Sequence, residues 1–182
     1  MDNYIYTFHK FHYIYILPAY KIVKLKNISK FPIPLEWQLI LINEGSLTQN
    51  LHALTGNTLN IKKYQNFSKI SIHNHKNLRC IWLENSIYTK FLFARSIWIL
   101  NYINNININV TTNLPLGKSI IKSEVEIYKK LHEIYYGYCQ YLEEEFQKNT
   151  PMWGRKYTMY YNNKSSITIQ EFFSPLIINF FY

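Results

Sequence analysis

The sequence is poor in cysteine, in long apolar runs and in basic runs, and each shortage excludes a class of protein. Its two cysteines, Cys80 and Cys139, allow at most one disulfide, and a reduced compartment fits at least as well. No uncharged apolar stretch reaches about 18 residues, so no membrane span is predicted. The first residues include Asp2 and no basic segment ahead of an apolar core, which argues against a secretory signal or an Arg/Ser-rich transit peptide.

Acidic residues are also scarce, with 11 against 20 basic ones, and the net charge is +9. A basic protein attracts nucleic acid or small anions. The lysines are scattered, however, because Lys62-Lys63 and Lys129-Lys130 are the only pairs and no run of five basic residues occurs. Undirected accumulation of lysines on the surface therefore explains them better than a polyanion partner does. The three arginines need a separate explanation.

Glycine is rare, with 5 residues, whereas isoleucine (26) and asparagine (20) are abundant. These abundant residues have A/T-rich codons, which favours an A/T-rich genome such as that of a plastid, an endosymbiont or a parasite. The hydrophobic content of 48% and the aromatic content of 18% argue against disorder. A chain of 182 residues is typical of one domain that buries a real core.

Helical patterns are predicted at three places. Pro34 can start a helix supported by Leu35, Leu39 and Ile42. The segment "GSLTQNLHALTG" has a capping box of serine and glutamine, a leucine stripe and a terminal glycine, so it predicts a second helix. Apolar residues at three- and four-residue spacing predict a long helix over residues 119–148.

Strands are predicted at residues 58–65, 69–74, 78–85, 90–100, 149–161 and 166–175, from alternating apolar residues bounded by turn residues. Strands in the middle and at the end, with helices before and between them, predict a single α+β domain around an antiparallel sheet. Residues 1–30 are expected to form an arm or a peripheral strand, and residues 31–182 the domain itself.

Three of these strands each carry one ionisable residue on a face that is otherwise apolar. They are Glu171 in "SITIQEFFSP", Arg95 in "KFLFARSIWIL" and Arg79 in "LRCIWL". An unpaired buried charge costs several kcal/mol, so such groups must be paired or must meet a charged ligand. One interpretation is an internal Arg–Glu pair that only holds the sheet together.

The other interpretation is a ligand cavity, because two arginines against one glutamate leave a surplus of positive charge. Guanidinium groups bind carboxylates through two parallel hydrogen bonds, so the predicted ligand is small, dianionic and partly apolar. Backbone N–H groups near Leu47 and Thr48, and near Leu116 and Gly117, could also bind an anion. Ordinary capping and an ordinary turn are the simpler interpretation of both segments.

Six segments in order, "GSLTQNL", "LRCIWL", "FARSIW", "LPLGKS", "WGRKY" and "ITIQEFFSP", resemble the chorismate lyases (chorismate pyruvate-lyases), especially those of cyanobacteria and red algal plastids. The resemblance runs from about Pro34 to Pro175. It implies an antiparallel sheet with helices packed on one side and a cavity closed by helical flaps. It also implies plastid encoding and a monomer, with chorismate as small-molecule substrate and no nucleic-acid partner.

The implied reaction converts chorismate to 4-hydroxybenzoate and pyruvate for quinone biosynthesis of the plastoquinone or ubiquinone type, with no cofactor and no metal. Arg79 would hold the ring carboxylate, and Arg95 would be suited to the enolpyruvyl carboxylate. Glu171 would meet the 4-hydroxyl, either as a base or as an orienting group. Leu47 and Leu116 would supply backbone amides and apolar walls. Arg155 in "WGRKY" matches a family segment, and we expect it to be structural.

Two alternatives stay open. The first is a non-catalytic protein of the same fold that binds a small anion, as in effector-sensing domains of transcription regulators. The roughly 30 residues before the resemblance show no helix-turn-helix pattern, which favours an enzyme. The second is a basic RNA-binding protein, which would place its aromatic and basic side chains together on a solvent-facing sheet. His73 and His75 lack a nearby carboxylate or cysteine and make a weak metal site.

Overall fold

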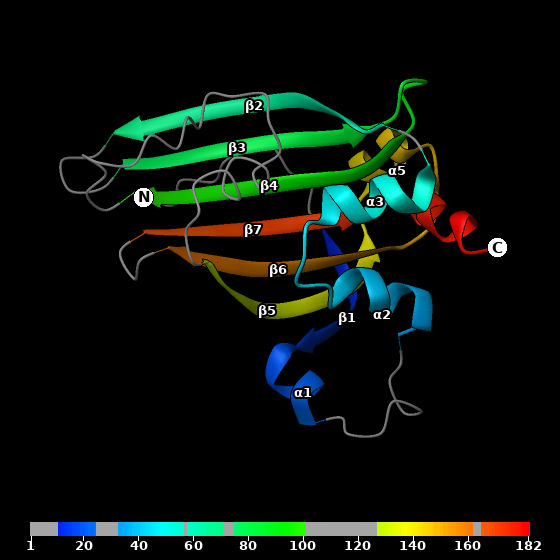
Figure 1. The fold of residues 1–182 in the computed structure, drawn as a ribbon, viewed down its shortest axis with the longest axis horizontal. Helices are drawn as coiled ribbons and strands as arrows, with labels where there is room; N and C mark the ends of the chain where they lie inside the picture. Colours follow the sequence, from blue (N-terminus) through cyan, green and yellow to red (C-terminus); the bar gives the residue numbers. More distant parts are fainter. Residues whose placement is uncertain (1–10, 25–32, 57, 71–74, 101–126, 162–164) are drawn as a thin grey trace.

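The computed structural model describes residues 11–24, 33–56, 58–70, 75–100, 127–161 and 165–182. In this described part the chain forms a seven-stranded sheet of order β1-β5-β6-β7-β4-β3-β2, with every pair antiparallel (Figure 1). The strands are β1 His12–Pro18, β2 Asn60–Ile70, β3 His75–Glu84, β4 Lys90–Leu100, β5 Ile127–Tyr138, β6 Met152–Tyr161 and β7 Ser165–Phe173. The helices are α1 Ala19–Lys24, α2 Leu35–Leu41, α3 Leu47–Thr55, α5 Gln140–Phe146 and the 3-10 helix η2 Pro175–Phe180.

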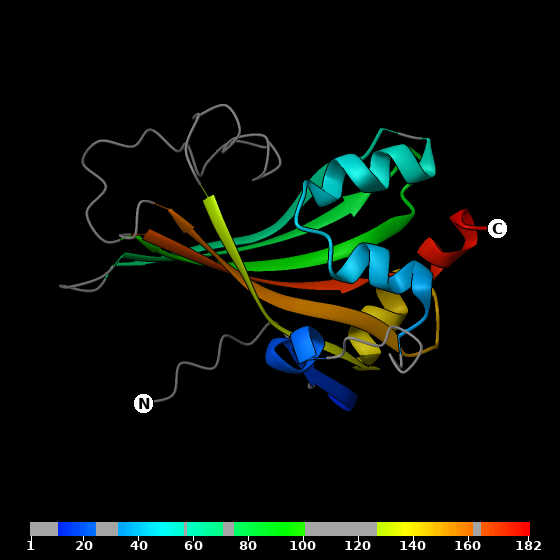
Figure 2. The same cartoon turned by 60° about the horizontal axis from the view of Figure 1, so that its bottom comes forward.

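The predicted α+β class with one antiparallel sheet is confirmed. Helices α2 and α3 lie over one face of the sheet, here called the front face, as predicted (Figures 1 and 2). The short helix α5 packs on the opposite, back face, so the expectation that the helices lie on one side of the sheet is wrong for this helix (Figure 2). None of the described helices is long and apolar enough to cross a lipid bilayer.

The sheet is covered on both faces where α2, α3 and α5 pack, so it has two cores. Phe173 belongs to the front core with Trp37 and Leu51, whereas its neighbour Phe172 belongs to the back core with Leu142. Successive residues of a strand point to opposite faces, so both can be buried only in a sheet with two covered faces. Strand runs in this chain are therefore apolar on both faces.

The long helix predicted over residues 119–148 is wrong. Residues 119–126 lie outside the described residues, and the rest forms strand β5 and the seven-residue helix α5. The three- and four-residue spacing of Tyr128, Leu131 and Tyr135 does not mark one buried helix face, because β5 has a register shift between Leu131 and Glu133, and Tyr128 is 65% exposed whereas Tyr135 is buried. The aromatic and β-branched residues of this segment favour a strand once β1 and β6 flank it.

Two smaller predictions also need correction. The predicted strand 58–65 and the first two residues of the predicted strand 69–74 belong to one strand, β2, and residues 71–74 lie outside the described residues. Helix α2 follows Pro34 as predicted, but its predicted apolar stripe faces outward, with Leu35 63% and Leu39 60% exposed. The buried positions are Trp37, Ile40 and Leu41, which also follow three- and four-residue spacing.

Helix α3 begins and ends as predicted. The Ser46 hydroxyl accepts a hydrogen bond from the Gln49 backbone N–H at 3.5 Å. Gly56 ends the helix in a left-handed conformation with φ of 65°. Leu47 and Leu51 are buried against the sheet, so the start of α3 is fixed above the front face.

A Gly154→Ala substitution is expected to lower the free energy of unfolding by about 1–3 kcal/mol, because it overpacks the sheet. An added Cβ would lie 2.1 Å from Tyr135 Cε2 and 2.7 Å from the Glu171 carbonyl oxygen. Urea denaturation measures the effect, with Gly45→Ala as the control. At Gly45 the nearest atom would lie 3.4 Å away, so a change below about 0.5 kcal/mol is expected. Equal losses in the two variants would contradict this account.

Candidate functional site

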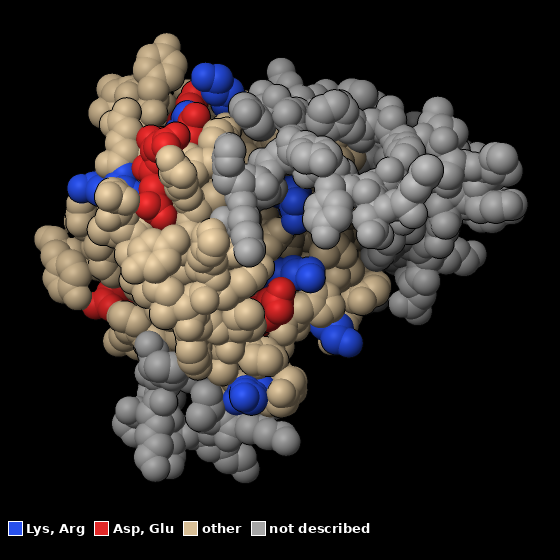
Figure 3. Space-filling view, turned by 180° about the vertical axis from the view of Figure 1, so that it is seen from behind, with Lys and Arg blue, Asp and Glu red and all other residues tan. Residues whose placement is uncertain are grey.

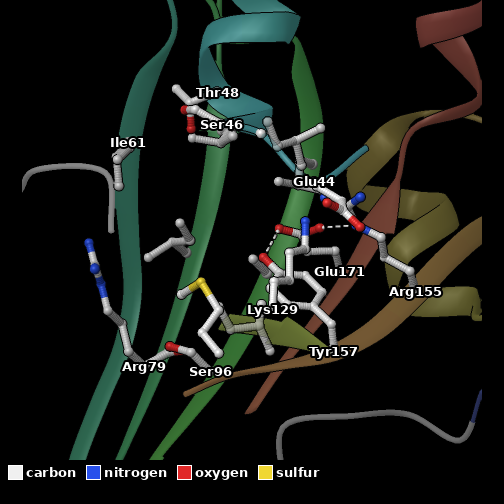
Figure 4. Close-up of a pocket in the computed structure, with 18 residues that line it drawn as sticks. Glu44, Ser46, Thr48, Ile61, Arg79, Ser96, Lys129, Arg155, Tyr157 and Glu171 are labelled. Carbon is white, nitrogen blue, oxygen red and sulfur yellow. Dashed lines mark hydrogen bonds and ion pairs between the residues drawn. The ribbon is translucent and has the colours of Figure 1, made fainter. Parts of the chain in front are cut away.

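A pocket of about 120 Å³ lies in the front face of the sheet, below the start of α3 (Figure 4). Strands β2 to β7 and the segment between α2 and α3 supply its walls. Its polar members are Glu44, Ser46, Thr48, Arg79, Ser96, Lys129, Arg155, Tyr157 and Glu171. The others are Gly45, Leu47, Ile61, Ile81, Leu83, Leu92, Ala94, Met159 and Ile169.

Glu171 is buried in this pocket, and both of its carboxylate oxygens are held by neighbours on β6. Arg155 Nε donates to Oε2 at 2.7 Å, and the Tyr157 hydroxyl donates to Oε1 at 2.9 Å. The sheet register explains these contacts, because Arg155 pairs directly with Glu171 across β6 and β7, and Tyr157 is two residues further on the same face. A buried carboxylate needs such partners.

Arg155 also fastens the end of α2 to the sheet. Its Nη1 donates to the carbonyl oxygens of Ile40 at 3.0 Å, Leu41 at 3.1 Å and Asn43 at 3.0 Å. The last carbonyls of a helix have no partner inside the helix, so this guanidinium satisfies groups that burial would otherwise leave unpaired. The expected structural role of Arg155 agrees with these contacts, although the residue also lines the pocket.

Burial and the neighbouring charges set the protonation states of this group. Burial by itself would lower the pKa of Arg155, but the adjacent Glu171 carboxylate and the neighbouring Tyr157 and Tyr135 together outweigh it, and the pKa is raised. Burial, and then the Glu171 charge, raise the pKa of Tyr157 well above its usual value. Arg155 therefore stays charged and Tyr157 stays a hydrogen-bond donor, so the carboxylate is held in one orientation.

Arg79 lies in the same pocket, as predicted, on a wall that β3 forms with Ile81 and Leu83. Figure 4 shows its guanidinium across the pocket from the Glu171, Tyr157 and Arg155 side chains. Its side chain is 3% exposed, and burial lowers its pKa. A guanidinium stays protonated in proteins even so, so Arg79 brings a positive charge to the pocket.

The prediction that Arg95 joins this pocket is wrong. Ala94 is the residue that pairs with Glu171, so Arg95 projects from the back face, where its Nη2 donates to Gln170 Oε1 at 2.8 Å. Because both sheet faces are apolar near α3 and α5, sharing a face with Phe93 did not reveal which side Arg95 is on. Figure 3 views the back of the molecule, where the described basic and acidic side chains are interspersed rather than gathered in one basic stripe.

The predicted backbone contacts have two outcomes. Leu47 and Thr48 do line the pocket, at the first turn of α3. Leu116 and Gly117 lie outside the described residues. Among the residues that the structure describes, no three His, Cys, Asp or Glu side chains are placed to hold a metal ion. Cys80 and Cys139 are buried and not joined in a disulfide.

Lys129 and Tyr157 are among the pocket residues that the sequence did not predict. Lys129 Nζ donates to the Asn43 carbonyl oxygen at 2.7 Å and lies 4.4 Å from the centre of the Tyr157 ring. Burial lowers the pKa of Lys129 to about 8, and the Arg155 charge adds to this effect. The helix prediction hid Lys129. Read as a strand, the segment would have placed it on the face opposite Tyr128.

The pocket has the predicted surplus of positive charge, but its second cation is not the residue that the sequence predicted. Arg79, Lys129 and Arg155 face two carboxylates, Glu44 and Glu171. Arg155 is matched by its ion pair with Glu171. Lys129 therefore takes the place in this balance that the sequence had given to Arg95.

Fold and pocket together define a class: an α+β protein with one antiparallel sheet and a pocket in that sheet that is rich in cations. A protein-family model described as "Chorismate pyruvate-lyase Rv2949c-like" matches residues 41–181. The chain therefore belongs to the Rv2949c-like chorismate pyruvate-lyase family, and the resemblance noted from its sequence is confirmed.

The chain is also similar to several relatives and to one solved structure. The "uncharacterized protein ycf21" of Antithamnion sp. is 44% identical over 160 residues, which is 87% of this chain and 86% of the relative. The ycf21 protein of Pyropia yezoensis is 30% identical over 173 residues, 93% of this chain and 98% of the relative. The crystal structure of gene product SA0254 from Staphylococcus aureus has a TM-score of 0.52 at 8% identity, covering 73% of this chain and 90% of its own. That likeness supports the fold alone.

Proposed function

We propose that this protein is a chorismate lyase, which eliminates pyruvate from chorismate and releases 4-hydroxybenzoate. Family membership suggests the substrate. The observation that carries the proposal is that Arg79 and Glu171 line one pocket from different strands, with Glu171 held by Arg155 and Tyr157. Chorismate is a dicarboxylate with a ring and a hydroxyl, which matches cationic, apolar and acceptor groups in this pocket.

The ring carboxylate is assigned to Arg79 and to the start of α3. A guanidinium fork matches a carboxylate through two parallel hydrogen bonds. Backbone N–H groups at Leu47 and Thr48 lie at a helix N-terminus, which favours negative charge. The apolar walls at Ile81, Leu83 and Met159 would then face the ring.

The 4-hydroxyl is assigned to Glu171. Each carboxylate oxygen already accepts one hydrogen bond and can accept another, so a substrate hydroxyl has an acceptor in a fixed position. Arg155 and Tyr157 already hold this carboxylate in one position, which favours orientation of the hydroxyl over abstraction of the C4 proton. Chorismate labelled with deuterium at C4 tests this choice, because label retained in the pyruvate methyl group would exclude a base mechanism.

The reaction asks little of the protein beyond position and charge. Loss of enolpyruvate makes the ring aromatic, so no metal or cofactor is proposed. A pocket with fixed donors would orient the substrate and stabilise charge on the leaving enolpyruvate.

Incubation of the purified protein with chorismate tests the proposal. Equal amounts of 4-hydroxybenzoate and pyruvate are expected, above the rate of a protein-free control, which corrects for spontaneous breakdown. Saturable chorismate binding without turnover would instead support the alternative, a non-catalytic protein of the same fold. Absence of both binding and turnover would reject both.

The product suggests the setting. We infer that 4-hydroxybenzoate from this protein feeds quinone biosynthesis of the plastoquinone or ubiquinone type in a plastid. The similar ycf21 proteins of Antithamnion sp., Porphyra purpurea and Cyanophora paradoxa support plastid encoding, as does the A/T-rich codon signature of the chain. Sequencing the gene in its genomic context tests the encoding, and a nuclear locus would contradict it.

A further inference from the structure

The pocket needs a second cation for a dianionic substrate, and Arg95 cannot supply it from the back face. Among the residues that the structure describes, three cationic side chains line the pocket: Arg79, Lys129 and Arg155. Arg155 is committed to Glu171 and to the carbonyl groups at the end of α2. Lys129 is therefore the candidate partner of a second carboxylate.

The contacts of Lys129 leave donors for a ligand. Its ammonium carries three N–H donors. One of them is directed to the Asn43 carbonyl oxygen at 2.7 Å, and the Tyr157 ring lies beneath the charge at 4.4 Å. Figure 4 shows Lys129 in the pocket with Tyr157 and Glu171. An aromatic face and one carbonyl hold the ammonium in place, while it keeps hydrogen-bonding capacity.

Lys129 is not needed to satisfy the carbonyl group that it contacts. The Asn43 oxygen also accepts a hydrogen bond from Arg155 Nη1 at 3.0 Å. A partly buried ammonium near Arg155 is disfavoured by burial and by repulsion, and the two nearby carboxylates of Glu171 and Glu44 offset this only in part. A charge kept at such a cost to stability is typical of a binding group rather than of a structural one.

We propose that Lys129 is a substrate-binding residue, whose ammonium holds the enolpyruvyl carboxylate while Arg79 holds the ring carboxylate. The choice of chorismate rests on the proposed function. Because Lys129 also contacts Asn43, a bound carboxylate would be connected through one ammonium to the segment that joins α2 to α3. The second carboxylate of the substrate is thereby recognised separately from the first.

Comparison of two ligands isolates this role. Chorismate has both carboxylates, whereas 4-hydroxybenzoate has only the ring carboxylate. Loss of a hydrogen bond to a charged group costs about 1.5–3 kcal/mol, so Lys129→Met is expected to weaken chorismate binding roughly 10- to 100-fold at pH 7. The affinity for 4-hydroxybenzoate is expected to change less than about threefold, which is less than the loss of one such hydrogen bond would cause. Calorimetry measures both, with Lys130→Met as control, because Lys130 is exposed on the other face.

The dependence on pH provides a second readout. The groups that face Lys129 are Arg155 and Tyr157 from β6, Glu171 from β7 and Glu44 from the segment before α3. The pKa values of Arg155 and Tyr157 are raised, so neither titrates near pH 8. Chorismate affinity is expected to fall as the pH rises through about 8, where Lys129 loses its proton. Arginine in Lys129→Arg keeps its charge above pH 8, so the chorismate affinity of this variant is not expected to fall there.

Stability supplies the third readout, and its sign follows from the lowered pKa of Lys129. The unfolded chain, with a lysine pKa near 10.5, binds more protons than the folded chain between pH 8 and 10.5, so the wild type gains stability across that window. Lys129→Met is expected to lack this gain and to have a higher melting temperature than the wild type at pH 7. The difference between the two proteins is expected to shrink by pH 10.

These outcomes separate the role of Lys129 from the proposed reaction. Calorimetry needs no turnover, so an inactive protein that still binds chorismate would leave the comparison intact. Equal weakening of chorismate and 4-hydroxybenzoate in Lys129→Met, or equal effects of Lys129→Met and Lys130→Met, would overturn the assignment. A wild type that does not bind chorismate would overturn the assignment together with the proposed function, whereas the melting experiment would still report the cost of the buried ammonium.

Discussion

Replacing Arg155 by methionine is expected to lower the free energy of unfolding by about 3–5 kcal/mol, which is the cost of breaking a buried ion pair from one side. The substitution leaves the Glu171 carboxylate buried without its cation. It also removes the donor to the carbonyl oxygens of Ile40 and Leu41, whereas Asn43 keeps Lys129 as a donor. Most of the loss should therefore come from the isolated carboxylate and the two orphaned carbonyls.

Urea denaturation followed by tryptophan fluorescence measures this change. Lys156→Met is the matched control, because Lys156 is the next residue and points to the other face, where its Nζ lies 3.7 Å from Glu133 Oε1 in a partly exposed ion pair. Such pairs contribute about 0–1 kcal/mol. The double variant Arg155→Met, Glu171→Gln removes the isolated charge and should regain part of the lost stability. A double variant as unstable as the single one would show that the stranded carboxylate is not the cause.

The strand pattern of β7 was sufficient to place Glu171 inside the protein. Side chains alternate strictly along a strand, so a glutamate in register with Ile169 and Phe173 must share their buried face. The same reasoning placed Arg79 with Ile81 and Leu83 in the pocket wall. Both results depend only on a period of two residues, which is a local property that a sequence displays directly.

Arg95 shows where this reasoning stops. Alternation says which residues of one strand share a face, but not which face of a neighbouring strand they meet. Only the register between β4 and β7, in which Ala94 and not Arg95 pairs with Glu171, decides that question. In a sheet with one solvated face, the apolar face is the buried one, so an apolar pattern would show which face carries Arg95. Here α3 covers one face and α5 the other, so both faces are apolar and the pattern does not decide.

Strand β5 and the contacts of Arg155 could not be predicted from the sequence for a related reason. The spacing in β5 fits a helix, and its flanking strands β1 and β6 override that local preference. Arg155 meets the carbonyl of Ile40 across a separation of 115 residues, and no local pattern signals such a contact. Interactions set by the pairing of distant segments therefore account for the residues that were misplaced or missed.

Removal of Arg79 or Glu171 is expected to have the largest effect on the reaction. A single preorganised polar or charged contact to the transition state typically contributes about 2.7–4 kcal/mol to the barrier. Arg79→Ala and Glu171→Gln are therefore each expected to lower kcat/KM for chorismate by about 100- to 1,000-fold. Glutamine keeps an acceptor for the Tyr157 hydroxyl, so the second substitution disturbs the buried network less than alanine would.

The control for both is Arg95→Ala, the arginine that the register of β4 places on the back face. It removes the same side chain as Arg79→Ala from a neighbouring strand, so a general loss of positive charge would affect both variants alike. If the pocket holds the substrate, Arg95→Ala should stay within a few-fold of the wild type under steady-state assay with chorismate, and melting temperatures show whether each variant is folded. A loss in Arg95→Ala as large as that in Arg79→Ala would place the reaction elsewhere, because a guanidinium directed away from Glu171 cannot contact a molecule bound beside it.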